Sequence, residues 1–391
     1  MANLYRLQMT SGKKIFFTVT NDLVFDQRMQ RICSSMVSFG YDVTLVGREM
    51  PGSPALPEMP FKQVRIALRN QKGKLFYLEY NYKLNRYLLS QQMDAICAID
   101  LDTIVPAYLV SKKKGIPRMY DAHEFFTEMI EVKRRGHIHF IWKKIEEWLV
   151  PKFSHGYTVG QAIADDLKKL YDVNYALIRN VPYYAPPIDI NAGIPEIIRE
   201  IMEAFNSKCP SPTPFIFYQG ALNEGRALLP MLEAMKKVNA RMLMAGSGNM
   251  ENEVMAFIRQ NGLQEKVYLC GNVPPHLLKH LTAHCYAGVT LYDAFSKNQY
   301  YSLGNKFFDY IMARKPQVCV NYPEYAAILK QFKVAIPIPE TSPAAIAFAL
   351  NNLIQDGVLY HELQHGCNDA ALALNWEKEA QQLRQSWEDV W

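Results

Sequence analysis

The chain has 391 residues, of which 49% are apolar and 21% charged, and a formal net charge of +5. This length exceeds what one hydrophobic core usually organises, so we expect two folded domains rather than a disordered chain. The mild basic excess suits an anionic ligand but is too small to require nucleic acid, and we expect no nucleic-acid partner.

Seven cysteines are scattered along the chain without a C-x-x-C pair, which indicates neither a disulfide framework nor a zinc site. A reducing cytoplasm is therefore the expected location. Met1 to Thr10 lacks the apolar core of a signal peptide, and no apolar run approaches the roughly 20 residues that span a bilayer. We expect a protein that is soluble or attached to a membrane only at its surface.

The first half of the chain alternates strand and helix patterns. A β-branched and aromatic run at 14–20 precedes helical apolar spacing at 26–39, and a second apolar run follows at 43–46. Further strand-like runs lie at 95–99 and 118–120. This order predicts a parallel sheet with helices on both faces, which binds ligands beyond the carboxyl ends of its strands.

Seven prolines from Pro182 to Pro214 predict a linker with one helix near 196–205. After it the alternation restarts, which predicts a second α/β domain. Its expected strands are 215–218, 241–244, 267–269 and 288–291, and its expected helices are 227–237 and 251–261. The last helical pattern, 376–391, carries aromatic residues near one face and needs a surface that buries them.

The segment 301–310 combines a Ser-Leu-Gly turn with a helix that begins near Asn305. Free backbone N–H groups and the positive end of the helix dipole suit a diphosphate there, and Lys306 adds a cation. Asp309, one turn further, can accept hydrogen bonds from ribose hydroxyls. The alternative is a capped helix with solvated Lys306 and Asp309.

Two glycine-bearing loops follow the first strands of the second domain. The loop from Gly220 ends at Arg226, which can hold phosphate oxygens, although an ordinary connection with a surface arginine has the same pattern. Gly246 and Gly248 in the next loop permit close backbone approach, but a plain turn also explains them.

In this order, these motifs and the segment 267–273 resemble the donor domain of glycosyltransferase family 4, the retaining group 1 glycosyltransferases with the GT-B fold. The resemblance covers nearly the whole chain. It implies an α/β fold of two Rossmann-like domains that face each other across a cleft, with the last helix crossing back to the first domain. The implied boundaries are a first domain at 1–185 plus the helix 374–391, a linker at 186–213 and a donor domain at 214–373.

That family typically has two glutamates separated by seven residues, and the corresponding positions here are Tyr301 and Asp309. Asp309 keeps a carboxylate for the ribose, whereas Tyr301 does not. The resemblance implies that Arg226 and Lys306 neutralise the leaving diphosphate and are catalytic. The residues expected to bind the donor are Gly220, Gly246, Leu303, Gly304, Asn305 and Asp309.

In the first domain, His123 lies in the segment Tyr120-Asp121-Ala122-His123-Glu124 after a strand. The resemblance implies a catalytic His123 that faces the cleft near the transferred sugar. A hydrogen-bonded structural histidine, or a weak metal site with Asp121 or Glu124, is the alternative.

The resemblance also implies acceptor-side roles for Asp26, Arg28 and Asn180, although Asp26 is equally placed to cap the helix that follows it. No metal or cofactor is expected beyond the nucleotide-sugar co-substrate. The spacing Asp100-Leu101-Asp102 suits a metal, but it lies in the first domain, away from the expected donor site.

The segment 133–153 interleaves basic and aromatic residues, which suits the surface of an anionic bilayer that carries lipid-linked acceptors. A partly buried helix with snorkelling lysines is the alternative, since Glu146 and Glu147 dilute the charge.

The resulting hypothesis is a glycosyltransferase that moves a sugar from a nucleotide diphosphate to a hydroxyl of a glycan or lipid-linked acceptor. We expect it to act in the synthesis of cell-surface polysaccharide or lipopolysaccharide, at the inner face of the cytoplasmic membrane. A nucleotide-sugar epimerase of similar architecture and a noncatalytic nucleotide-sugar-binding protein are the alternatives.

Overall fold

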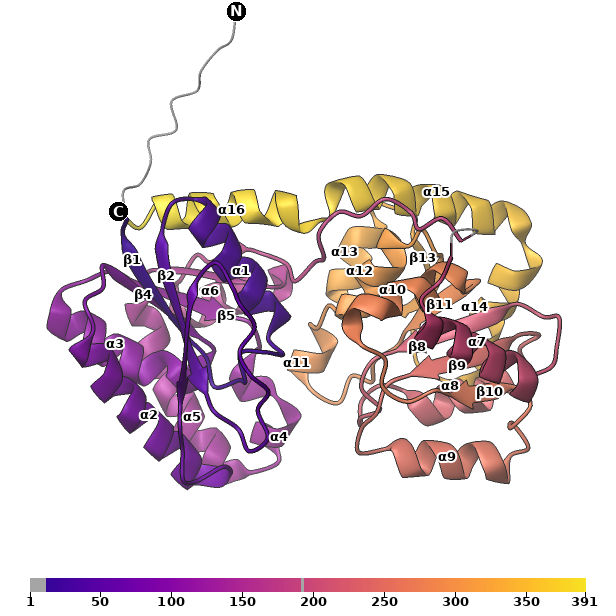
Figure 1. Ribbon diagram of the computed structural model, residues 1–391, viewed down its shortest axis with the longest axis horizontal. Coiled ribbons are helices and arrows are strands. Elements are labelled where there is room, and N and C mark those ends of the chain that lie inside the picture. Colours follow the sequence, from indigo (N-terminus) through magenta and orange to yellow (C-terminus); the bar gives the residue numbers. More distant parts are fainter. Residues whose placement is uncertain (1–11, 191–192) are drawn as a thin grey trace, which may run out of the picture. The chain divides into compact units, whose positions relative to one another are not determined.

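The computed structural model describes residues 12–190 and 193–391 (Figure 1). The chain forms two compact units. The first comprises the described residues up to Asn180 together with Glu379–Trp391, and the second comprises those of Val181–Lys378. Residues 1–11, for which no signal peptide is expected, lie outside the described residues, as do 191 and 192 of the expected linker.

The first unit is built on a parallel sheet with the strand order β3-β2-β1-β4-β5-β6-β7. Its strands are β1 (Lys14–Thr18), β2 (Asp42–Arg48), β3 (Lys62–Ile66), β4 (Ala95–Ile99), β5 (Arg118–Ala122), β6 (His155–Thr158) and β7 (Ala176–Leu177). Its longer helices are α1 (Gln27–Ser38), α2 (Gly73–Ser90), α3 (Ile104–Lys114), α5 (Gly136–Leu149) and α6 (Gln161–Tyr171), and α4 (Ile130–Lys133) is a short one. The strand order reverses between β1 and β4, where open α/β sheets bind ligands.

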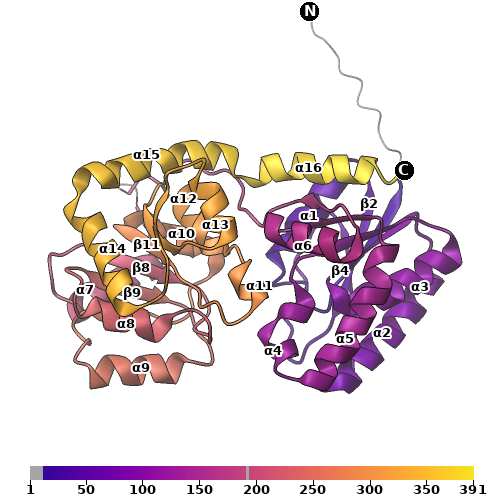
Figure 2. The same cartoon turned by 180° about the vertical axis from the view of Figure 1, so that it is seen from behind.

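Helices cover both faces of this sheet, because successive side chains of a strand point to opposite sides. Phe16 of β1 faces Tyr87 of α2, with ring centroids 6.5 Å apart. The next residue, Phe17, faces Trp387 of α16 (Trp376–Glu388) at 5.6 Å. Figures 1 and 2 show α2, α3 and α5 on one side of the sheet and α1 and α6 on the other.

The second unit contains a parallel sheet with the order β10-β9-β8-β11-β12-β13. Its strands are β8 (Phe215–Gln219), β9 (Arg241–Ala245), β10 (Val267–Leu269), β11 (Ala287–Thr290), β12 (Gln317–Val320) and β13 (Ala335–Ile338). Its helices are α7 (Glu196–Lys208), α8 (Leu228–Met235), α9 (Glu251–Gln260), α10 (Pro275–His284), α11 (Lys297–Tyr300), α12 (Asn305–Met312), α13 (Pro323–Leu329), α14 (Pro343–Gln355) and α15 (Gly357–Ala373).

The helix α7 belongs to the core of the second unit, although the sequence places it in a linker. Ile198 and Phe205 of α7 are fully buried and share one apolar cluster with Phe215 and Phe217 of β8. The Phe205 and Phe215 rings lie 5.3 Å apart at 71°. The prolines lie in the connections on either side of α7, and the described residues of 186–213 are part of the second unit.

Several elements have no counterpart in the sequence-based prediction. The helix α2 buries Phe76, Tyr80, Leu84 and Leu88 at a spacing of four, but its other side exposes large apolar residues, so the amphipathic pattern is weak. The edge strand β13 contains a proline, which weakens the strand pattern.

The seven cysteines are free, and all but Cys270 are buried. Within residues 12–190 and 193–391, no helix is long and apolar enough to cross a membrane.

Candidate functional site

The predicted donor residues of the second unit gather at the carboxyl edge of its sheet. Gly220 follows β8, Gly246 follows β9, and α12 begins fifteen residues after β11 ends. The strand order reverses between β8 and β11, so this edge is the switch point at which parallel sheets bind ligands.

Two of the predicted glycines are needed for the close approach of neighbouring loops. Gly246 has a φ of +145°, and a Cβ there would lie 2.0 Å from the carbonyl oxygen of Gly220. Gly220 itself has a φ of +129°. A side chain at Gly246 would push the two loops apart, which is why the structure requires glycine there.

Lys306 is a buried cation, with an exposed fraction of 7%. Its Nζ has no hydrogen-bond partner among the described residues. The ammonium lies 4.0 Å from the ring centroid of Tyr218 and 5.5 Å from that of Tyr292. Burial, and then the positive charge of Arg226, lower the pKa of Lys306 well below its usual value. Burying an ammonium group without a hydrogen-bond partner costs free energy of folding. Such a group is typical of a site that binds an anionic ligand.

Arg226 brings a second positive charge to the same ring. Its guanidinium carbon lies 4.5 Å from the ring centroid of Tyr292. Within the described part of the chain, Arg226 makes no ion pair at all. The Tyr292 ring therefore lies close to both Lys306 and Arg226. Its attraction for the two positive charges partly offsets their repulsion of each other.

Asp293 fixes the loop that carries Arg226. Its Oδ2 accepts a hydrogen bond from the Ala227 N–H at 3.2 Å, and its Oδ1 accepts one from the Thr341 hydroxyl at 2.8 Å. The Asp293 N–H in turn donates to the Gly225 carbonyl at 3.1 Å. Ala227 has a φ of +49°, which is unfavourable for a residue with a Cβ. These contacts hold the loop in the conformation that places Arg226.

The start of α12 is partly occupied by contacts within the protein. The Gly304 N–H donates to the Tyr325 hydroxyl at 2.9 Å. A Cβ at Gly304 would lie 2.0 Å from the Tyr292 hydroxyl, so a side chain here would displace that tyrosine. Leu303 is half-buried, and Asn305, the first residue of the helix, is exposed.

Asp309 lies one turn after Lys306 on the same helix, and its carboxylate accepts a hydrogen bond from Gln219. The Gln219 Nε2 lies 2.8 Å from Oδ2 of Asp309. Tyr301 directly follows the short helix α11, with Lys297 Nζ 5.6 Å from its ring centroid.

In the first unit, His123 follows β5 at the carboxyl edge of the sheet. Its ring is 31% exposed, and Nδ1 lies 4.0 Å from Oδ2 of Asp100, which follows β4. Burial, and then the charges of Arg28 and Arg31, lower the pKa of His123, so the ring is neutral at pH 7. Oδ1 of Asp100 accepts a hydrogen bond from the Glu124 N–H at 2.9 Å.

The three predicted acceptor-side residues make contacts that stabilise the first unit. Asp26 caps α1, because its Oδ1 accepts from the Met29 N–H at 3.0 Å, as the alternative interpretation holds. Arg28 is buried, with its guanidinium 3.0 Å from the Asp121 carboxylate. The amide oxygen of Asn180 accepts a hydrogen bond from the Arg31 guanidinium. These contacts are sufficient to explain all three residues structurally.

Sequence reasoning did not single out three residues that shape the strand edge of the second unit, Tyr218, Gln219 and Tyr292, which lie beside the cations and Asp309. In the first unit, Asp100 faces His123, whereas the sequence analysis names it only for its metal-like spacing from Asp102. Each of the four lies at the carboxyl end of a strand or within two residues of it. The rule that ligands bind at this end would have found them.

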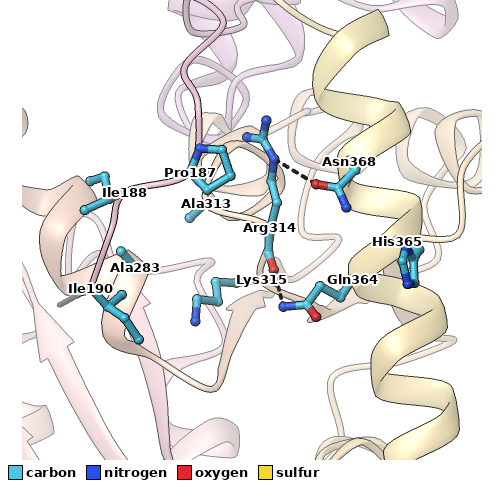
Figure 3. Close-up of a pocket in the computed structure, with 10 residues that line it drawn as sticks. All are labelled: Pro187, Ile188, Ile190, Ala283, Ala313, Arg314, Lys315, Gln364, His365 and Asn368. Atoms are coloured by element: carbon cyan, nitrogen blue, oxygen red, sulfur yellow. Dashed lines mark hydrogen bonds between the residues drawn. The ribbon is translucent and has the colours of Figure 1, made fainter.

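A separate cavity of about 330 Å³ lies in the second unit (Figure 3). Its walls come from the segment before α7, from α10 and α15 and from the turn after α12, and include Arg314, Lys315, Gln364 and Asn368. None of the predicted site residues lines it. Across the described residues, no group of three or more His, Cys, Asp or Glu side chains is placed to hold a metal ion.

Comparison with known protein families identifies both halves of the chain. Residues 202–372 match the model of the glycosyl transferases group 1, and residues 27–182 match that of glycosyltransferase family 4. The chain therefore belongs to the glycosyltransferases that these two models together describe. No curated protein sequence matches it.

Solved structures show that the fold is GT-B, as expected from the sequence. Sucrose-phosphate synthase from Thermosynechococcus elongatus is 12% identical, with a TM-score of 0.77 over 96% of this chain and 98% of that one. HepE from Anabaena, solved with UDP and glucose, is 13% identical, with a TM-score of 0.73 over 96% of this chain and 99% of that one. WaaG, a glycosyltransferase of lipopolysaccharide biosynthesis, is 13% identical, with a TM-score of 0.66 over 95% and 98%.

Proposed function

We propose that this glycosyltransferase binds a nucleoside diphosphate sugar at the carboxyl edge of the second unit's sheet and transfers the sugar to a hydroxyl acceptor. The observation that carries the proposal is the buried ammonium of Lys306, which has no hydrogen-bond partner and lies beside a second cation, Arg226. A diphosphate supplies the negative charge that both groups lack. The UDP bound to HepE is consistent with a donor of this class.

In the proposed reaction, the bond between the sugar's anomeric carbon and the diphosphate oxygen breaks, and the diphosphate keeps the electron pair. The acceptor oxygen forms the new bond to the same carbon and releases its proton. Negative charge grows on the leaving diphosphate, so Arg226 and Lys306 stabilise the transition state more than the bound donor. We propose that the configuration of the anomeric carbon is retained, as the family resemblance implies.

Asp309 and His123 have further roles in this proposal. Asp309 accepts hydrogen bonds from the ribose hydroxyls of the donor. His123, neutral at pH 7, acts near the transferred sugar as a hydrogen-bonding group rather than as a cation. We propose a glycan or lipid-linked acceptor in the synthesis of cell-surface polysaccharide, in the cytoplasm at the inner face of the membrane.

The main test is the double variant Arg226→Ala/Lys306→Ala, measured by calorimetric titration with UDP, GDP and ADP sugars. Wild type binds at least one of them, and the double variant loses about 100-fold or more in affinity, because truncating a charge that pairs with a ligand costs about 2–5 kcal/mol. The matched control, Arg259→Ala/Lys330→Ala, removes the same two residue types from exposed positions of the same unit. Equal affinity in wild type and the double variant would contradict the proposed site.

Turnover separates the proposed activity from its alternatives. His123→Ala lowers kcat by about 100-fold, as loss of one preorganised polar group does, while donor affinity changes little. The exposed His361→Ala is the control. Donor consumption without any acceptor, giving an epimer, would favour an epimerase. Tight donor binding without turnover towards any acceptor or water would favour a noncatalytic binding protein.

We further propose that α5 and the segment before it contact an anionic membrane. Phe140 and Ile141 of α5 are 62% and 56% exposed, and Lys133, Arg134 and Arg135 precede them in exposed positions. Apolar side chains that insert between lipid headgroups, flanked by cations, are typical of a helix that lies on such a surface. Of the other aromatics of the segment, Trp148 is 51% exposed, whereas Phe153 is buried and Trp142 packs against Phe126 at 4.9 Å.

Sedimentation with phospholipid vesicles tests this contact. Wild type binds vesicles that contain phosphatidylglycerol more strongly than vesicles of phosphatidylcholine alone, and Phe140→Ser/Ile141→Ser reduces that binding. Phe348→Ser is the control, because Phe348 is 69% exposed in the second unit. If the α5 variant binds both vesicle types as wild type does, the helix is not the contact.

A further inference from the structure

We propose that Gln219 is a positioning residue for donor recognition: its side-chain amide fixes the carboxylate of Asp309 in the orientation that reads the ribose. This inference rests on the proposed function and adds a determinant that lies behind the binding surface. Gln219 is the last residue of β8 and is 3% exposed. It therefore acts through Asp309 rather than through direct contact with solvent-side ligand atoms.

The hydrogen bonds of Gln219 define the orientation of its amide. Nε2 lies 2.8 Å from Oδ2 of Asp309, and Oε1 lies 3.1 Å from the hydroxyl of Thr282 on α10. An ionised carboxylate only accepts hydrogen bonds, so the NH2 group must face Asp309. The Oε1 atom then faces a hydroxyl that can donate to it. Three elements, α10, β8 and α12, are thereby joined in one chain of polar contacts.

A buried amide in this place has a cost that packing alone would avoid. An apolar residue at the end of β8 would bury the same surface without needing two polar partners. The neighbouring residues add a reason for it. Gly220, the next residue, lies beside Lys306, since a Cβ there would be 3.8 Å from the lysine Nζ. Consecutive residues of the strand end thus adjoin the cation and the carboxylate of α12.

Aspartate makes this support more important than it would be for glutamate. The aspartate carboxylate has one fewer rotatable bond and a shorter reach, so a single orientation must serve the ribose. A charge-assisted hydrogen bond from a buried amide holds that orientation. Gln219→Met removes this hydrogen bond from a carboxylate that is only partly buried.

The test compares affinities for ribose and deoxyribose nucleotides, measured by calorimetry with UDP, GDP and ADP and with their 2′-deoxy and 3′-deoxy forms. Wild type prefers the ribonucleotide over at least one deoxy form by about tenfold, the usual value of a hydrogen bond to a charged group. Gln219→Met keeps the volume of the side chain but has no amide, and it reduces this preference to about twofold. Thr282→Val, which removes the hydroxyl behind the amide, gives an intermediate ratio.

Gln317 provides a matched control on the other side of α12. It is fully buried, its Nε2 donates to the Phe307 carbonyl at 2.9 Å, and its Oε1 accepts from the Thr290 hydroxyl at 2.7 Å. Gln317→Met removes an equivalent buried amide without touching Asp309. It lowers thermal stability but leaves the ratio of ribose to deoxyribose affinity at the wild-type value.

The possible results separate this inference from the proposed function. A Gln219→Met protein that binds nucleotides and keeps the wild-type ratio would overturn the positioning role. Wild type that binds ribose and deoxyribose forms equally would overturn it too, while the donor site itself would stand. Wild type that binds none of these nucleotides would contradict the proposed function, and the inference would fall with it. An equal change of the ratio in Gln317→Met would show a general loosening of α12 instead.

Discussion

Lys306 shows how a single side chain can couple ligand binding to pH. In the free protein its pKa is lowered, first by burial and then by Arg226. A bound diphosphate would stabilise the ammonium and raise that pKa, so binding takes up a proton at pH values above the pKa of Lys306 in the free protein. Without ligand, the lowered pKa makes folding less favourable, because the unfolded chain binds the proton of Lys306 more tightly than the folded protein does. This cost to the free energy of folding diminishes as pH rises towards 10.5, the usual pKa of lysine.

The corresponding prediction concerns the affinity for the nucleoside diphosphate between pH 7 and pH 9. Affinity should fall as pH rises above the pKa of the free protein's Lys306, by at most about tenfold per pH unit for one linked proton. Lys306→Arg should remove this slope, because a guanidinium stays charged throughout. Titration calorimetry in buffers of different ionisation enthalpy measures the proton uptake directly. A wild type and a Lys306→Arg variant with the same pH slope would exclude Lys306 as the linked group.

At the same scale, the sequence singles out three charged residues of the proposed donor site but not the aromatic residues beside them. Arg226, Lys306 and Asp309 stand in a recognisable order, so a family pattern finds them. Tyr218 and Tyr292 lie beneath these cations only because β8 and β11 are adjacent in the sheet. That adjacency depends on strand order, which neither composition nor spacing along the chain provides.

At the scale of elements, the prediction succeeded for two short apolar strands. The strands β4 and β10 begin and end at the residues predicted, 95–99 and 267–269. It failed where tertiary contacts decide: the prolines around α7 indicate a linker, but the apolar face of α7 packs on β8. The helix α2 was missed for a different reason: residues on its outer side are apolar as well, so its amphipathic pattern is weak.

The turn after α12 yields a prediction about an element end. Arg314 has a φ of +57°, and its guanidinium donates to the Asn368 side chain at 3.2 Å (Figure 3) and to the Ala185 carbonyl at 3.0 Å. Arg314→Ala should lower the free energy of unfolding of the second unit by about 2–4 kcal/mol, because several hydrogen bonds to a buried charge are lost. Arg314→Gly loses the same contacts but removes the strain of a positive φ.

The glycine variant should therefore be about 1 kcal/mol more stable than the alanine variant, as expected for a left-handed residue without a Cβ. Urea denaturation of the two variants measures this difference. Equal stability of both, or a less stable glycine variant, would mean that backbone strain at position 314 is negligible.

At the scale of the whole molecule, the chain's last residues belong to the first unit, although they follow the second in sequence. Trp387 is fully buried against Phe17 and Tyr41, at 5.6 Å and 6.5 Å between ring centroids. Arg179 and Glu379 form an ion pair at 3.1 Å, and the Glu379 carboxylate also accepts from the Arg179 N–H at 2.9 Å. The first unit is thus completed only when the last helix is made.

Trp387→Ala should destabilise the first unit by about 3–5 kcal/mol, the usual cost of removing a buried tryptophan side chain. Trp391→Ala is the natural comparison, because Trp391 is 41% exposed and should cost much less. Two-domain proteins often unfold in separate steps. Denaturant unfolding of Trp387→Ala should shift one transition and leave that of the second unit in place. A simultaneous shift of both transitions would indicate that the two units unfold together.

The distribution of the cysteines makes the chain convenient for site-specific chemical labelling. Thiols react with maleimides as thiolates, and burial raises the pKa of Cys33 and Cys97 well above the usual value and that of Cys270 to about 11. The native thiols should therefore react slowly near pH 7, including the one at Cys270 that is partly exposed. A cysteine introduced at the exposed position Ala221 could carry a fluorophore in the loop from Gly220 to Arg226 without removal of any native cysteine.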